Sequence, residues 1–148
     1  MRFGRGYSAA EKGLKKVIDM GDDTALTLTR NHTNTIFLVG EAVLAVTLPA
    51  AATIPNGWTV KFIGHHATSA TLTNTVTCTC AGTNELFGHC VTGGDNGNRQ
   101  LQPVSAGAKD NIKLHTIAAK GDWFEITRCG AGYFVFGRSR ITNGLPMA

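Results

Sequence analysis

Residues 42–64, AVLAVTLPAAATIPNGWTVKFIG, decide the fold class of this chain. The first part, residues 42–48, is apolar and rich in β-branched side chains, and Pro49 ends it because proline cannot donate a hydrogen bond to a strand ladder. Residues 58–63 alternate large apolar side chains with polar ones, as a half-buried strand does. The sequence PNG at residues 55–57 is typical of a turn. The stretch therefore predicts two strands joined by a loop.

The same strand-and-turn pattern continues along most of the chain. The length of 148 residues with 43% hydrophobic residues supports one domain, and 18 glycines with only 16% charged residues favour a β-rich chain. Further strands are predicted at residues 25–29, 35–39, 70–79, 85–87, 100–104, 111–118, 123–128 and 133–136. We expect residues 25–29 and 35–39 to be a hairpin or neighbouring strands. The fold class is therefore all-β: a single β-sandwich, a jelly-roll-like domain or a β-barrel.

Charge divides the chain into an arm, a body and a tail. Residues 1–16 contain five basic residues and one acidic residue, so this segment alone carries the net charge of +4 of the whole chain. We assign residues 1–23 to a basic N-terminal arm, 24–136 to the β-rich domain and 137–148 to an irregular C-terminal tail. The basic residues of the arm are the candidates for binding an acidic partner: Arg2, Arg5, Lys12, Lys15 and Lys16. A solvated terminus without a partner is the alternative.

The four cysteines are expected to be free thiols. The N-terminus has no apolar signal-peptide region, and no apolar run reaches the roughly 18 residues that span a bilayer, so we expect a soluble protein made in a reducing compartment. A zinc site formed by Cys78, Cys80, His89 and Cys90 is conceivable. One residue between two cysteines on a strand wraps a metal poorly, so buried thiols are the preferred interpretation.

No catalytic or cofactor-binding motif is present. The chain has no G-x-S-x-G elbow, phosphate-binding loop, G-x-G-x-x-G sequence or H-E-x-x-H sequence. Its ten carboxylates are scattered over turns and strand edges without a pairing that would mark an acid and a base. We therefore expect no enzyme activity and no cofactor.

Nucleic acid is not the expected partner, because the body is neutral and the aromatic residues lack interleaved arginine and lysine. Their alternate positions in strands favour a core. The aromatic residues interpreted in this way are Trp58, Phe62, Trp123, Phe124, Tyr133, Phe134 and Phe136. Within residues 123–128, Trp123 is expected to share one face with Glu125, and Phe124 to lie on the other face with Ile126.

Several segments resemble β-rich units of tailed-bacteriophage virion proteins, namely capsid decoration (cement) proteins, head fibres and tail-fibre domains. The segments are TLPAAATIPNGWTVKFIG at residues 47–64, LQPVSAGAKDNIKL at 101–114 and GDWFEI at 121–126. The resemblance covers residues 42–126 and leaves the arm and the tail outside it.

This resemblance implies a homotrimeric structural virion protein on the capsid surface, made in the host cytoplasm, with the major capsid protein as its partner and no membrane association. The chain has no fibre shaft or coiled coil, which favours a decoration protein. Two alternatives remain open: a receptor- or glycan-binding tip domain of a tail or head fibre, and a small β-barrel enzyme or nucleic-acid-binding module. The Thr-rich segment 70–79 is expected near the three-fold contact, since the predicted strand edges lack protective lysine and proline.

Overall fold

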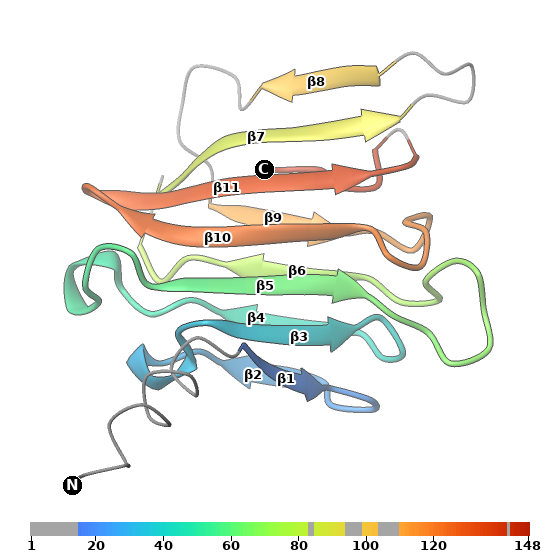
Figure 1. Ribbon diagram of the computed structural model, residues 1–148, viewed down its shortest axis with the longest axis horizontal. Coiled ribbons are helices and arrows are strands. Elements are labelled where there is room, and N and C mark those ends of the chain that lie inside the picture. The colour runs from blue at the N-terminus through green and yellow to red at the C-terminus, as the bar shows by residue number, and fades with distance from the viewer. Residues whose placement is uncertain (1–14, 83–84, 94–98, 104–109, 142) are drawn as a thin grey trace, which may run out of the picture.

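The computed structural model describes residues 15–82, 85–93, 99–103, 110–141 and 143–148 and contains two packed β-sheets (Figure 1). The seven-stranded sheet contains, in spatial order, β1 (Lys16–Asp19), β3 (Thr35–Val39), β5 (Thr59–Gly64), β10 (Trp123–Cys129), β11 (Gly132–Ser139), β7 (Leu86–Gly93) and β8 (Arg99–Pro103). The four-stranded sheet contains β2 (Ala25–Thr27), β4 (Leu44–Thr47), β6 (Val76–Thr79) and β9 (Asn111–Leu114). The predicted all-β sandwich is confirmed.

The chain winds back and forth between the two sheets from β1 to β6. Strands β1, β3 and β5 pair in parallel in the larger sheet, and β2, β4 and β6 pair in parallel in the smaller one. Short 3₁₀ turns at Arg30–His32 and Ala51–Thr53 lie on connections between the sheets. The later strands β10 and β11 form an antiparallel hairpin, which pairs with β5 on one side and with β7 on the other.

This winding overturns one expectation about neighbouring strands. The prediction that residues 25–29 and 35–39 form a hairpin or lie side by side is wrong, because β2 pairs with β4 while β3 pairs with β1 and β5. The two strands face each other across the core instead. The connection between them crosses the thickness of the sandwich, which a tight hairpin turn would not do.

The predicted strand at residues 70–79 is shorter in the structure. Only its last four residues form β6, and Thr71 makes an isolated bridge to Ala119. By contrast, β7 extends well beyond the predicted residues 85–87, as far as Gly93. Side-chain alternation alone does not show where a ladder partner begins or ends.

Both ends of the chain contribute more to the sandwich than their composition suggested. Residues 16–19, within the segment assigned to the arm, form the edge strand β1, with Lys16 opposite Thr35. Residues 137–139, within the segment assigned to the tail, end β11. Met147 forms a bridge to Ile112 and so extends the smaller sheet beyond β9. The two segments therefore help to complete the sheet edges.

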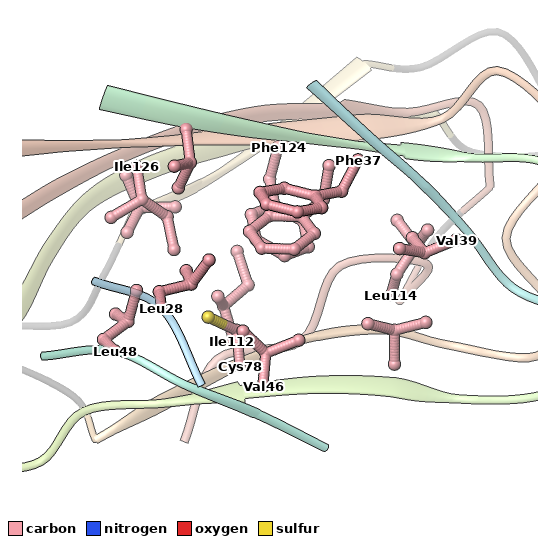
Figure 2. Close-up of a cluster of buried hydrophobic side chains, with 14 of the residues drawn as sticks. Leu28, Phe37, Val39, Val46, Leu48, Cys78, Ile112, Leu114, Phe124 and Ile126 are labelled. Carbon is pink, nitrogen blue, oxygen red and sulfur yellow. The ribbon is translucent and has the colours of Figure 1, made fainter. Parts of the chain in front are cut away.

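The core lies between the inner faces of the two sheets. Phe37, Phe62 and Phe124, which come from neighbouring strands of the larger sheet, are fully buried and stacked, with ring centroids 5.3 Å and 5.0 Å apart. Figure 2 shows Phe37 and Phe124 above side chains of the other sheet, among them Val46 and Ile112. Phe124 and Ile126 are both buried, so the predicted faces of β10 are confirmed.

Candidate functional site

The outer face of the seven-stranded sheet carries a cluster of aromatic side chains. Because side chains alternate along a strand, Phe124 lies in the core while its neighbour Trp123 is only half-buried. Phe136 on β11 and Phe87 on β7 are each 38% exposed. We call this cluster the aromatic face; it consists of Phe87, His89, Trp123, Phe134 and Phe136.

The rings of the aromatic face form a continuous series across three adjacent strands. The ring centroids are 5.8 Å apart for Phe87 and Phe134, 6.1 Å for Phe134 and His89, 5.2 Å for His89 and Phe136, and 5.5 Å for Phe136 and Trp123. All four contacts have edge-to-face geometry, which aromatic pairs prefer. The contacts fix the rings relative to one another and give a partially exposed, pre-organised apolar surface.

A cation ends the series on the β5 side. The Nζ atom of Lys61 lies 3.9 Å from the centroid of the Trp123 ring, which is cation–π geometry. On the other side of β10, Arg138 of β11 lies directly opposite Trp123 in the β10–β11 register. The aromatic residues are not interleaved with arginine and lysine in the sequence, but cross-strand pairing brings Lys61 and Arg138, which are far apart in sequence, beside Trp123.

The arm joins the body on the same side of the sheet as the aromatic face. Lys15 Nζ lies 3.8 Å from Oε2 of Glu125, and Glu125 projects outward from β10 between Trp123 and Thr127. Both partners are partly exposed, so this ion pair contributes little to the stability of the fold. It lies at Lys15, the residue that precedes β1. Of the candidate capsid-binding residues, Lys15 lies here. Lys16 begins β1, where its register with the buried Thr35 puts it on the opposite side of the sheet from Glu125. Arg2, Arg5 and Lys12 lie outside the described residues.

The candidate zinc ligands are not brought together by the fold. Cys78 and Cys90 are buried in the core, whereas His89 lies on the outer face of the same strand as Cys90 and contacts Phe136. Burial raises the pKa of the Cys78 thiol well above its ordinary value, and burial raises the pKa of Cys80 and of Cys90 to about 12. A metal binds the thiolate and must displace the thiol proton, so a raised thiol pKa lowers the affinity for a metal. No group of three or more ligating side chains occurs among the described residues.

Sequence reasoning placed part of the aromatic face in the core. The buried positions of Trp58, Phe62, Phe124 and Tyr133 confirm the core interpretation for those residues. Trp123, Phe134 and Phe136 lie outside the core. Phe87 was not singled out, and His89 was named only as a candidate zinc ligand. The sequence did contain a signal for outward aromatic residues. Adjacent residues in a strand, such as Trp123 and Phe124, point to opposite faces, so the two cannot share one face of the sheet.

Neither the helices of the described residues nor comparison with known proteins assigns this chain to a protein family. The described part of the chain has no helix that combines the length and the apolar character needed to cross a bilayer. Comparisons with protein-family models, with curated proteins and with solved structures found no match to this chain.

Proposed function

We propose that this chain is a structural virion protein that binds the outer surface of an assembled phage capsid as a decoration protein, with the major capsid protein as its partner. The observation that carries the proposal is the ion pair of Lys15, the residue before β1, with Glu125, which lies on the same side of the sheet as the aromatic face. Lys15 and the aromatic face therefore lie on one side of the sheet, and the sequence that precedes Lys15 carries the basic residues Arg2, Arg5 and Lys12.

Such a surface is suited to binding another protein. Aromatic anchors supply most of the binding energy in many protein interfaces, and charges around them steer the encounter and set its orientation. Rings that are already held in place lose little conformational entropy on docking. A protein that binds only the assembled lattice stabilises that lattice by mass action.

Removing residues 1–14 is expected to weaken capsid binding by at least about tenfold, because three basic side chains at an interface rim each contribute a fraction of this energy. The cut preserves β1, whose first residue Lys16 pairs with Thr35, whereas removal of residues 1–16 would shorten an edge strand. Co-sedimentation with capsids assembled without the protein, over a range of salt concentrations, measures the effect.

A second variant tests the aromatic face in the same assay. Phe136→Ser should also weaken binding, while Ile117→Ser, which removes a 41% exposed apolar side chain outside the aromatic face, should not. Capsid binding that is unchanged both by the truncation and by Phe136→Ser would overturn the proposed function.

Self-association as a trimer is the second part of the proposal, and the outer face of the four-stranded sheet supports it. Small outward side chains line up in register there; we call them the threonine face, and they are Ala25, Thr27, Ala45, Thr47, Thr77 and Thr79. Strand β2 is an edge of this sheet and has the sequence ALT, without a charge or a proline. The row of small side chains that contains Thr77 ends at Lys113 on β9, which lies opposite Thr77. The edge at β2, without a charge or a proline, favours pairing with another copy.

Light scattering is expected to give a mass of about three times 15.7 kDa at micromolar concentration. Thr77→Lys places a charge on the threonine face and should shift the protein toward monomers, because a buried unpaired charge is costly. Thr68→Lys, in the exposed loop after β5, is the control and should leave the mass unchanged. A wild-type mass near 15.7 kDa at every concentration would contradict the trimer.

A further inference from the structure

The start of β10 and the end of β11 lie at the same end of the larger sheet (Figure 1). A small pocket lies there, at the end of the aromatic face. Its volume is about 260 Å³. The residues that line it are Lys120, Gly121, Asp122, Trp123, Arg138 and Arg140. Three of these side chains are cations and one is a carboxylate, so the lining carries a net positive charge.

The turn that forms one wall of the pocket is held by backbone hydrogen bonds. Gly121 N donates to the carbonyl oxygen of Gly64 at 2.8 Å, and Lys120 N donates to that of Ala70 at 2.9 Å. Asp122 N closes the turn by donating to the carbonyl oxygen of Ala119 at 2.9 Å. Because neighbouring segments hold this wall in place, the pocket exists before any ligand binds.

The carboxylate of the pocket is already fully engaged within the protein. Asp122 is buried and accepts hydrogen bonds from Ala119 N at 2.8 Å, from Ser139 Oγ at 2.7 Å and from Arg140 N at 3.0 Å. These bonds, together with Arg140 Nε at 3.6 Å, satisfy its oxygens. Asp122 therefore acts as a structural anchor for the two wall segments and orients the cations around it.

The cations differ in how far the protein uses them. Arg140 is oriented by Asp122 and by a hydrogen bond that its Nη2 donates to the carbonyl oxygen of Lys120, and its remaining donors stay available. Arg138 is exposed and its guanidinium makes no hydrogen bond or ion pair with any described residue. The same holds, within the described part of the chain, for the ammonium group of Lys120.

We propose that this pocket binds the phosphate group of a phosphate monoester. With Asp122 neutralising one of the three cations, the lining has an excess charge close to +2, which complements the charge of about −2 on a phosphate monoester at neutral pH. Two guanidinium groups offer the planar donor pairs that recognise phosphate oxygens. The ester substituent lies toward Trp123. This proposal is independent of capsid binding, because phosphate binding is measured on the isolated protein.

Nuclear magnetic resonance titration of the full chain with glucose 6-phosphate, inorganic phosphate and glucose tests the proposal. The side-chain N–H signal of Trp123 should move in a saturable manner with glucose 6-phosphate. The signal of Trp58 serves as an internal control, because that indole is buried and donates to the carbonyl oxygen of Thr29 at 3.2 Å. Glucose 6-phosphate should bind at least about tenfold more tightly than glucose.

Inorganic phosphate should compete for the same site, and its affinity distinguishes the source of the anion. Equal affinity for the two phosphates identifies free phosphate as a sufficient ligand, and tighter binding of the ester shows that its substituent contacts the protein; both support the phosphate site. Saturable binding of glucose with the same affinity, or no shift of the Trp123 signal with either phosphate, overturns it.

Charge-removing variants locate the site. Arg138→Gln and Lys120→Gln should each weaken binding of glucose 6-phosphate by about tenfold, since a hydrogen bond to a charged group is lost. Lys113→Gln removes one positive charge on β9, in the other sheet, and is the matched control. An equal loss of affinity in all three variants would show non-specific attraction to a basic protein and overturn the proposal.

Discussion

Replacement of Phe124 by alanine is expected to lower the free energy of unfolding by about 3–5 kcal/mol. Phe124 is completely buried among apolar side chains (Figure 2), and its ring stacks on that of Phe62 with a centroid separation of 5.0 Å. Neighbouring strands on both sides hold the backbone of β10, so the cavity left by the ring cannot collapse completely. Urea-induced unfolding followed by circular dichroism measures the loss.

Phe136→Ala is the matched control for this substitution. It removes the same side chain from the same sheet, but Phe136 points outward and is 38% exposed. Its replacement should cost about 1 kcal/mol, because it loses edge contacts with His89 and Trp123 but leaves no internal cavity. Equal losses for the two variants would mean that the assignment of core and outer faces is incorrect.

Replacement of Gly88 by alanine is expected to cost more than about 4 kcal/mol, enough to unfold a domain of ordinary stability. Gly88 lies in the middle of β7 with φ +136°. A Cβ at this position would overlap the backbone carbonyl oxygen of Val135 in β11, which pairs with Gly88 in the parallel ladder. Since the clash involves backbone on both sides, only separation of the two strands relieves it.

Gly57→Ala separates the effect of the clash from the effect of backbone conformation. Gly57 also has a positive φ of +85°, but its Cβ would have no heavy atom within 4 Å. Its replacement should therefore cost only about 1–2 kcal/mol, the usual penalty for a non-glycine residue in this conformation. Thermal unfolding of both variants provides the comparison, and similar melting temperatures would contradict close packing of β7 against β11.

Local patterns in the sequence predicted the strands whose two faces differ most in polarity. Thr59–Gly64 and Trp123–Cys129 each have one buried face, and their alternation was visible without a structure. The turn before the first of them was also predictable, since the glycine in PNG is needed for a positive φ. In these segments the local preference and the final structure agree.

The pairing partners of the strands could not be predicted in the same way. Alternation in residues 25–29 and 35–39 shows which side chains are buried, but it is the same whether the two strands share a sheet or face each other across the core. Nothing in the five polar residues 30–34, which connect these two segments, specifies a crossing of the sandwich. Parallel partners such as Leu44 and Val76 are linked through long intervening segments, so their pairing depends on the whole fold.

The candidate site depends on the same long-range pairing. Sequence showed that Trp123 and Phe124 point in opposite directions, but the position of Lys61 above the Trp123 ring requires the β5–β10 register. The proximity of Arg138 to Trp123 similarly requires the hairpin of β10 and β11. In the sequence, Lys61 and Arg138 each look like an ordinary surface residue. Only the fold shows that both lie beside Trp123.

The winding of the first six strands also determines how the domain responds to damage. Because consecutive strands enter opposite sheets, neither sheet is made from one continuous part of the chain. Detaching β3, for example, would pull on the segments that lead to β2 and β4, and so disturb the other sheet. The two layers therefore cannot behave as separate unfolding units, and local opening is confined to the ends and outer loops. A domain built in this way distributes a force applied to one sheet over both layers.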